Sequence, residues 1–572
     1  MPRTSCKVHM EFVDASAVED SNVSTEDNAS IGNIELVKEE IQHQAYAIPD
    51  LNNYLLDGSK SILQEDTSVS FISSDISLDD CTFNDNPVVA VGFSKNHTSA
   101  GVKLYFGDDY PVEIKLTWYN LLGTVLATCV FYPDKLQYFC NKQVENYGGL
   151  KIEFIRTRLP QQRVTLNHIK YGTEIDWEDE EIKSATIYEE VDVTSATIPI
   201  NTAEIAIVDT DNNFDLSNQK GTWKSIQKRQ PVTITEEVNG VDTTCGTLYV
   251  DTWKSQGNVV NFSFIDLIGL MDKTKFYDGQ IYNAVPAGEI ISSIMESAGI
   301  DEYSVADEVA EMLLTGHIAI CTHREALQQV VFACGAIADC SRTGIINIYL
   351  PDRYADSFVS TDRKFMGTTI EVDDYVSGVA ITYNQYNLSA DRSQICKDTL
   401  PAGNTLLEFT EPYTSIEVAG GTLIEAHINY AIIYMESQGE CVVTGYKYEK
   451  NEVTYTVSVE EIDGGEEENI ISYSKCTMFN IGRVKEVAER ILNYYQLRQI
   501  VDMRYLIENE RTGSWLTILD ANGGMALTGI ISQSIDLTGG FISSAKCRGY
   551  SKIATDYAYT GTEIYTGERG LI

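Results

Sequence analysis

The feature that most constrains this chain is a period-two alternation of apolar and polar residues, which recurs in separate blocks along the sequence. Val112, Ile114, Leu116 and Trp118 alternate with polar residues in the clearest instance. Such alternation indicates a strand with one buried face, and turn clusters such as residues 120–123 separate successive strands. The sequence therefore predicts a mainly β, multidomain chain of the α+β class, with Trp118 in a core.

Changes in composition and turn signals divide the chain into seven segments. Turns recur about every 8–12 residues in the first β block, which is the spacing of a sandwich or jelly roll. In order, the segments are an acidic arm (1–44), this jelly-roll block (45–172), a second β block (173–275), a helical α/β segment (276–364), a third β block (365–475), a C-terminal helix with a β-meander (476–550), and a polar extension (551–572).

Two helices carry explicit boundary signals. Apolar residues repeat at helical spacing over 287–298, with Pro286 before them and Gly299 after them. Proline is favoured in a first helical turn and glycine just past a helix end. Thr322 and Glu325 form a capping-box pattern ahead of a second apolar stripe. We expect both segments to be helices.

Three further local predictions follow from the same kinds of pattern. A third apolar stripe runs along residues 480–497 and predicts a helix. Alternation on both sides of residues 450–451 predicts a hairpin over 442–459. The acidic arm is predicted to be exposed, with one short helix at 34–41.

The charge balance excludes several classes of partner. The chain has 572 residues, with 42 Lys and Arg against 84 Asp and Glu, so its net charge is −42. Nucleic-acid binding depends on cationic side chains that neutralise phosphates, and anionic membranes attract cations. We therefore expect no stable nucleic-acid binding. No apolar run is long enough to span a bilayer and no signal peptide is expected. The 12 cysteines contain no Cys-x-x-Cys pair, which favours free thiols and manufacture in a reducing cytoplasm.

One stretch gathers side chains of the kind that bind metals: His317, Cys321, His323, Cys334 and Cys340. Zinc sites use tight pairs of such residues, and His317 to His323 approaches that spacing. However, Cys334 lies on an apolar helical stripe, and His323 lies inside the capping box. The sequence therefore predicts no metal and no cofactor.

Catalytic signals are equally weak. The sequence has no Gly-x-Ser-x-Gly elbow, no phosphate-binding Gly-x-x-x-x-Gly-Lys loop and no Gly-x-Gly-x-x-Gly motif. Carboxylates crowd at 174–181 and 460–468, but a catalytic pair needs one carboxyl in an apolar pocket, and these runs are predicted loops. We expect no catalytic residues and no enzyme. Tyr119 and the aromatic residues of loops remain weak candidates for binding a sugar.

The ordered series of blocks resembles the tail hub proteins of phages of Gram-positive bacteria. Residues 46–52, 55–59, 73–77, 99–106 and 163–172 resemble a discoidin-like jelly roll that precedes such hubs. Residues 184–193, 198–201, 204–211 and 227–232 are similar to the first hub barrel. The helices with residues 324–329 and 483–498, and the turn at 539–540, also fit the hub pattern.

The resemblance implies a structural role without an active site. A homotrimer would place two barrels per subunit, at 173–275 and 365–475, around an axial channel at the distal end of a phage or phage-like tail. The partners would be the tail tube or its initiator, a spike or tip protein, and other baseplate proteins. A tape-measure protein is a possible further partner. We expect Asp, Glu and neutral polar residues to line the channel; the alternative is that the acids only solvate the outer surface. Assembly would take place in the host cytoplasm. The alternatives are a glycan-binding module at 45–172 and, less favoured, a cell-wall glycosidase.

Overall fold

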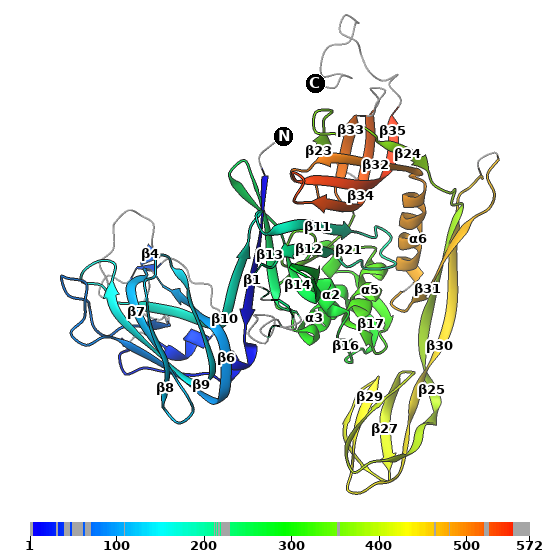
Figure 1. Ribbon diagram of the computed structural model, residues 1–572. Coiled ribbons are helices and arrows are strands. Elements are labelled where there is room, and N and C mark those ends of the chain that lie inside the picture. The colour runs from blue at the N-terminus through cyan, green and yellow to red at the C-terminus, as the bar shows by residue number, and fades with distance from the viewer. Residues whose placement is uncertain are drawn as a thin grey trace, which may run out of the picture.

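The computed structural model describes residues 4–29, 32–38, 46–47, 61–62, 70–107, 109–210, 212, 214–215, 218, 229–351, 355–462, 465–479, 481–519 and 525–552. The described chain is mainly β and has several sheets, as predicted. Figure 1 shows a β lobe at one side, a central body, and a long β ribbon that ends in a small lobe. In the described residues, no helix is both long and apolar enough to cross a membrane.

One sheet of nineteen described strands links the β lobe to the central body. Its strands are β1 (Thr4–Val13), β2 (Asn22–Ser24), β5 (Phe71–Ile72), β6 (Val88–Phe106), β7 (Pro111–Tyr119), β8 (Val125–Phe131), β9 (Gln137–Thr157), β10 (Thr165–Trp177), β11 (Ile182–Glu190), β12 (Thr202–Val208), β13 (Pro231–Val238), β14 (Val241–Gln256), β15 (Val259–Ile265), β23 (Ala355–Val359), β24 (Thr369–Val372), β32 (Gln499–Leu506), β33 (Trp515–Leu519), β34 (Met525–Asp536) and β35 (Ile542–Lys552).

The remaining elements form smaller units. The ribbon and its lobe contain β25 (Gly378–Leu400), β26 (Gly403–Glu408), β27 (Tyr413–Ala419), β28 (Thr422–Ala426), β29 (Tyr430–Met435), β30 (Gly439–Ser458) and β31 (Ile470–Cys476). The short strands are β3 (Tyr46–Ala47), β4 (Ser61–Ile62), β16 (Lys275–Phe276), β17 (Ile281–Pro286), β18 (Tyr303–Val305), β19 (Leu313–His317), β20 (Cys321–Thr322), β21 (Ile337–Asp339) and β22 (Ile346–Tyr349). The helices are α1 (Ala15–Asp20), the 3-10 helix η1 (Ile34–Lys38), α2 (Leu267–Met271), α3 (Ala287–Ala298), α4 (Asp307–Ala310), α5 (His323–Cys334) and α6 (Ile481–Tyr495).

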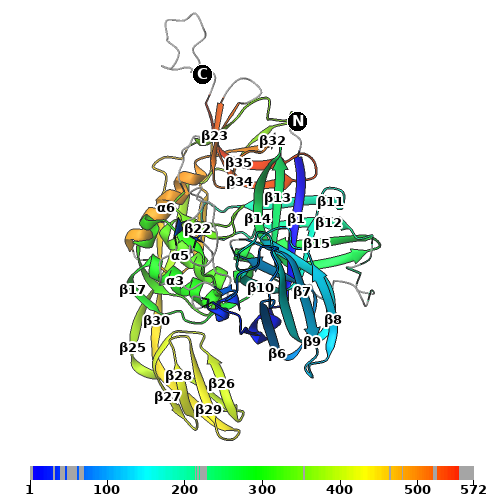
Figure 2. The same cartoon turned by 90° about the vertical axis from the view of Figure 1, so that its left-hand side faces the viewer.

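The β lobe has its own hydrophobic core. Strands β6, β7 and β9 pair antiparallel, and their inward side chains surround the fully buried Trp118, as predicted. Ala17, Val23 and Val37 belong to the same core, although they precede residue 45. The N-terminal residues therefore help to build this lobe, which Figure 2 turns toward the viewer.

The prediction that the first 44 residues are an exposed arm is wrong for the described part of that segment. Cys6, Val8 and Met10 are fully buried, because β1 pairs with β13 on one side and with β10 on the other. The short alternation in β1 lies among polar residues and has its partners more than 150 residues away. The 3-10 helix η1 occupies part of the predicted 34–41 helix, whose last residues lie outside the described residues.

The second β block and the C-terminal meander share one core. Strands β11, β12, β15, β14 and β13 pair antiparallel in that order, and β11 also pairs with β34 of the meander. Ile205 and Phe262 from the first unit and Tyr505 and Ile530 from the second are all buried in the same cluster. The two segments therefore form one continuous structural body.

The predicted hairpin at 442–459 is wrong. Strand β30 runs without a break through residues 450–451, and Lys450 lies opposite Tyr386 of β25. A partner strand of comparable length decides the local structure, since β30 pairs with β25 over nearly its whole length, with two register shifts. The two strands form the long ribbon, and β26–β29 form a lobe with its own small core at its end. The strands of 378–476 thus form a ribbon and a lobe, with pairings separate from those of the large sheet.

The helices predicted at 287–298, after Thr322 and within 480–497 are confirmed. Helix α3 spans Ala287–Ala298 and ends at Gly299, whose φ of 71° is left-handed and suits glycine. The Thr322–Glu325 capping box at the start of α5 is present in both directions. The apolar stripes of α3, α5 and α6 face one another in a core that lies beside the β25–β30 ribbon.

We expect Phe262→Ala to destabilise the protein by about 3–5 kcal/mol, because it removes a fully buried ring and leaves a cavity. The Phe262 ring lies 5.4 Å from Trp177 and 5.6 Å from Phe214, centroid to centroid. The midpoint of thermal unfolding measures the effect. Tyr132→Ala, at a ring that is 65% exposed, is the control and should shift the midpoint little. Equal shifts in the two variants would contradict the shared core.

Candidate functional site

A buried charge pair lies where β11, β34 and the loop after β21 meet. Arg342 Nε donates to Glu189 Oε1 at 3.2 Å, and the two side chains are only 4% and 1% exposed. Gln533 Nε2 of β34 donates to Glu189 Oε2 at 2.6 Å. Tyr505 and Ser543 in turn donate to Gln533 Oε1 at 3.3 and 3.0 Å. The network therefore joins β11, the C-terminal strands β32, β34 and β35, and the α/β segment that contains Arg342.

The local backbone positions this network. Arg342 adopts a left-handed φ of 53° in the loop that follows β21. A Cβ atom added to Gly246 of β14 would lie 3.7 Å from the Arg342 Cα. The two backbones therefore pack closely. Glu189 occupies an inward position of β11, between the buried Ile187 and Val191. A carboxylate at an inward strand position is the sequence signal that could have identified this site.

A second buried polar group supports the same junction. Ser341 Oγ donates to Asp339 Oδ1 at 2.6 Å and lies 2.7 Å from the Thr512 hydroxyl. Asp266 caps α2 by accepting from Gly269 N at 2.8 Å, and it accepts from Asn201 N at 3.0 Å. Burial raises the pKa of Asp339 to about 6 and that of Asp266 to about 7. These hydrogen bonds fix loops against one another.

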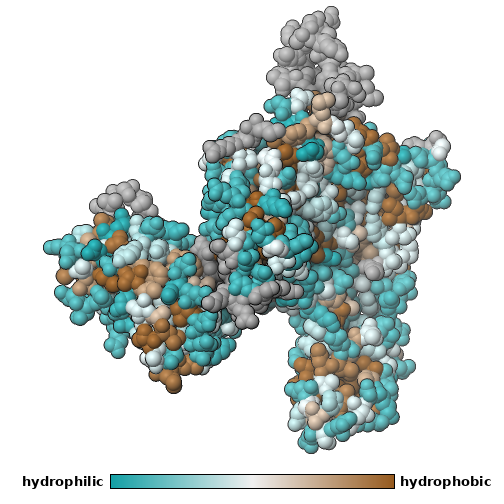
Figure 3. All heavy atoms as spheres, in the orientation of Figure 1, coloured by the Kyte–Doolittle hydropathy of each residue, from teal (hydrophilic) through white to brown (hydrophobic). Residues whose placement is uncertain are grey.

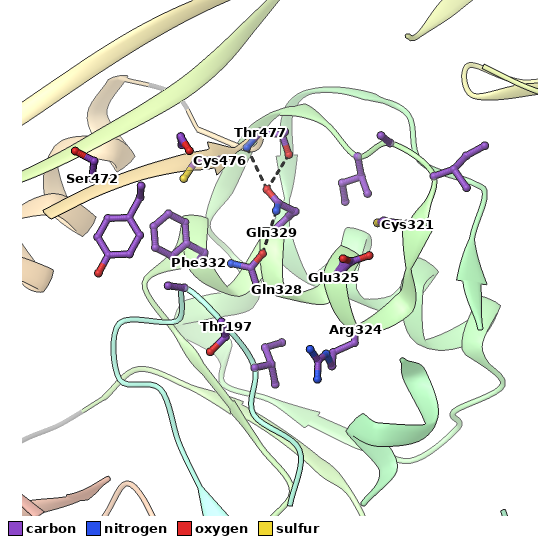
Figure 4. Close-up of a pocket in the computed structure, with 17 residues that line it drawn as sticks. Thr197, Cys321, Arg324, Glu325, Gln328, Gln329, Phe332, Ser472, Cys476 and Thr477 are labelled. Atoms are coloured by element: carbon purple, nitrogen blue, oxygen red, sulfur yellow. Dashed lines mark hydrogen bonds between the residues drawn. The ribbon is translucent and has the colours of Figure 1, made fainter. Parts of the chain in front are cut away.

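A pocket of about 690 Å³ lies between α5, the loop at 196–198 and β31 (Figure 4). Two glutamines of α5 cross its floor. Gln328 Nε2 donates to Ser195 O at 3.0 Å, and Gln329 Oε1 accepts from Thr477 N at 3.2 Å and from Thr477 Oγ1 at 3.0 Å. Cys321 also lines the pocket, and burial raises the pKa of its thiol to about 12. The described lining therefore offers amide and hydroxyl groups for hydrogen bonding, next to a thiol that stays protonated.

The candidate metal ligands lie in separate surroundings. His317 Nε2 bonds Asn429 Oδ1 at 2.7 Å, whereas His323 bonds Thr274 at 2.8 Å and Ser297 at 3.1 Å. Cys334 and Cys340 are buried in the helical core. Burial lowers the pKa of both histidines. In the part of the chain that the structure describes, no group of three or more His, Cys, Asp or Glu is arranged to hold a metal ion.

The carboxylate runs lie at the surface. In the first run, Asp179 accepts from Cys6 N at 2.8 Å, and Asp176 contacts His9. In the second run, Glu466 pairs with Arg498 at 2.8 Å, while Asp463 lies outside the described residues. A surface carboxylate without an apolar pocket has no means of raising its pKa for general acid catalysis.

No protein-family profile matches this sequence, and no curated protein matches it. Among solved structures, a tail protein from Neisseria meningitidis MC58 is 10% identical, with a TM-score of 0.41 over 66% of this chain and 93% of that one. A prophage tail protein from Shewanella oneidensis is 13% identical, with a TM-score of 0.36 over 64% and 93% of the two chains. A prophage tail protein from Listeria monocytogenes EGD-e is 7% identical, with a TM-score of 0.37 over 67% and 92%. These TM-scores are too low to establish a shared fold.

We expect Arg342→Met to destabilise the protein by about 3–5 kcal/mol, because it leaves the buried Glu189 carboxylate unpaired. Adding Glu189→Gln should recover part of this loss, since it removes the buried charge. Urea unfolding measures the changes. The control is Arg324→Met, which breaks the half-exposed pair with Asp272 and should cost about 1 kcal/mol or less. A loss in Arg342→Met no larger than the control's would contradict a buried charge pair.

Proposed function

We propose that this chain is a structural hub at the distal end of a phage or phage-like tail, where it joins the tail tube to the spike and the baseplate or tip. The observation that supports this proposal best is the pairing of β11 with β34, which fuses two antiparallel β units into one body. Two fused β units per chain suit a ring in which three copies present six similar units to a tube.

The second barrel unit of the proposed hub is the C-terminal meander rather than the third β block. Strands β32–β35 pair antiparallel, take in β23 and β24, and share their core with β11–β15. The strands over 378–476 instead form the ribbon and its lobe, which project from the body (Figure 1). We propose that the ribbon reaches toward a neighbouring baseplate component.

The charge of the chain bears on the channel. Three copies of a chain with net charge −42 repel one another unless the acids are solvated or spread out. A conduit for DNA functions best when it does not bind phosphates, and cationic side chains would bind them. We propose that Asp, Glu and neutral polar residues line the axial channel, that the chain holds no stable nucleic acid, and that it has no catalytic role.

We propose that β24, an edge strand of the sheet, forms a contact between subunits. All four side chains of β24 are exposed, with Val372 at 67% and Ile370 at 46%. Apolar side chains on a strand at a sheet margin favour coverage by another chain, because an uncovered strand of this kind invites aggregation.

We expect the purified protein to form a trimer, three times 63.7 kDa, which mass photometry can measure. Val372→Glu should lower the fraction of trimer at a given concentration, since it places a charge in the proposed contact. The control is Val241→Glu, at a side chain that is 66% exposed on the β13–β14 hairpin, and it should leave the trimer intact. A protein that stays monomeric at high concentration and inside assembled particles would overturn the hub proposal.

Binding of a surface glycan by the jelly-roll lobe is a second candidate function, favoured by the exposed Tyr132 ring next to β8. The lobe's core includes residues before 45, so the full chain is the proper test object. We expect Tyr132→Ala to weaken binding to purified cell-wall glycan by about fivefold or more, because exposed aromatic faces stack on apolar ligand surfaces. Tyr434→Ala, at an exposed ring of the ribbon lobe, is the control. Unchanged binding in both variants would remove Tyr132 from any glycan site.

Exposed apolar residues gather on two lobes of the molecule, and Ile462 and Ile470 are also exposed at the second carboxylate run. Figure 3 shows apolar patches on the jelly-roll lobe and on the lobe at the end of the ribbon. Exposed apolar residues in these lobes include Leu122, Val125 and Leu406. Apolar patches on a surface mark contacts with other macromolecules more often than catalytic sites, which favours assembly or adhesion over a cell-wall glycosidase.

A further inference from the structure

The N-terminal strap, which we define as residues 4–24 with β1, α1 and β2, connects the jelly-roll lobe to the central body. Strand β1 lies between β13 of the body and β10, and the end of β10 beyond Tyr171 leads into the body. The strap then packs on the jelly-roll lobe, where Asn22–Ser24 pair with β6. Apart from this strap, β10 is the strand that runs from one unit into the other, as Figures 1 and 2 show.

His97 of β6 holds the jelly-roll end of the strap. Its Nδ1 lies 3.2 Å from Asp14 Oδ2 and its Nε2 lies 2.9 Å from Asp20 Oδ2. The imidazole is 2% exposed and lies beside the Phe93 ring, at 5.0 Å between centroids. Only a protonated imidazole donates from both ring nitrogens. A neutral ring would turn a lone pair toward one of the two carboxylates.

The charged groups in contact with His97 are the carboxylates of Asp14 and Asp20. The Ser94 hydroxyl donates to Asp20 Oδ1, and this bond, with that from His97, holds the pKa of Asp20 well below its usual range. Asp20 also accepts from Ser94 N at 2.9 Å and Lys95 N at 3.1 Å. The nearby Tyr147 of β9 is buried, and burial raises the pKa of its phenol, so it stays neutral. The pair of carboxylates on the strap is thus the charge that faces the ring.

The middle of the strap makes a contact of the same kind. His9 Nδ1 lies 2.7 Å from Asp176 Oδ1, across the β1–β10 pairing. The bond with His9 is the main reason that the pKa of Asp176 lies below its ordinary value, and Lys7 of the strap adds to the effect. This contact also weakens when the histidine loses its proton.

Glu236 of β13 lies under the body end of the strap, opposite Cys6 of β1. Its side chain is fully buried, and neither carboxyl oxygen has a hydrogen bond of ordinary geometry. The acids that face it are Asp179 and Asp536, and burial together with these charges raises the pKa of Glu236 to about 8. Burial likewise raises the pKa of the neighbouring Cys6 and Cys245 thiols, so neither contributes charge.

We propose that the N-terminal strap is a proton-dependent fastener between the jelly-roll lobe and the body. It is tight while His97, His9 and Glu236 carry their protons, and it loosens when they lose them. The three contacts lie along the whole strap and respond in the same direction. When the strap detaches, β10 is the remaining strand of the described residues that joins the lobe to the body, so the lobe gains freedom to reorient about it.

The sign of the effect follows from each group. A released Glu236 has a pKa of 4.5, so the stability that its protonated form gives to the attached strap is complete below that pH and is lost as pH rises toward about 8. The two histidine contacts change in the same direction, because an imidazole that loses its proton loses both a donor and an opposite charge toward the carboxylate that it contacts. Protonation of Asp20 or Asp176 would oppose the trend only under strongly acidic conditions, because both pKa values are lowered.

Hydrogen exchange of the full-length protein, followed by mass spectrometry and corrected for intrinsic exchange rates, tests the fastener at pH 5.5, 7.0 and 8.5. We expect protection of residues 4–24 to fall by at least about tenfold from the lowest to the highest pH. Protection of β34 and β35 should change little over the same range, which shows that the body stays folded. A strap whose protection is independent of pH would overturn the proposal.

Two variants assign the effect to its residues. Glu236→Gln should flatten the pH dependence, whereas Glu237→Gln, on the adjacent exposed side chain of β13, should keep the full dependence. His97→Gln should lower protection of residues 14–24 at pH 5.5 toward the value that the unaltered protein shows at pH 8.5. Identical pH profiles for the two glutamate variants would show that Glu236 does not cause the pH dependence. An unchanged profile in His97→Gln would show that the His97 contacts do not hold the strap.

Discussion

The architecture depends on one long-range pairing, that of β11 with β34. The two strands are joined by the Glu189–Gln533 hydrogen bond, which spans 344 residues of chain. The helical core and the ribbon, which lie between them in the sequence, are excursions from this sheet, whereas β12–β15, β23, β24, β32 and β33 remain part of it. Closing so long a loop costs entropy, although the cost grows slowly with length. The shared apolar core compensates for that cost, and the buried Arg342–Glu189 pair defines how the strands meet.

Local sequence signals predicted those elements whose boundaries depend on residues close together in the sequence. The capping box at Thr322, the glycine after α3 and the buried Trp118 are of this kind. The failures involve partners that are distant in sequence. Strand β1 lies in a polar, acidic segment and is buried by β10 and β13, and residues 450–451 resemble a turn until β25 pairs with them. Register with a remote strand overrode local preference in both cases.

The polar junction illustrates why the site was harder to foresee than the helices. The residues that the sequence singled out, such as His317 and Cys334, are satisfied inside the helical core or by neighbouring amides. In the sequence, Glu189 is marked only by its inward position on an alternating strand, and Arg342 looks like an ordinary loop charge. Their burial becomes visible only when three distant segments come together. Such a junction is suited to holding units in fixed relation, which agrees with the structural role proposed for the chain.

The position of β1 also sets an order of events during synthesis. The first strand of the chain has β13 as one neighbour, and β13 ends at Val238. At the usual rate of about 5–20 residues per second, the ribosome needs roughly 10–50 s to make that partner after β1 has emerged. The core residues of the β lobe, the last of which is Tyr171, are synthesised before then, so β1 has one edge open while it waits for β13. A nascent chain of this design is most vulnerable to pairing with a neighbouring copy during that interval.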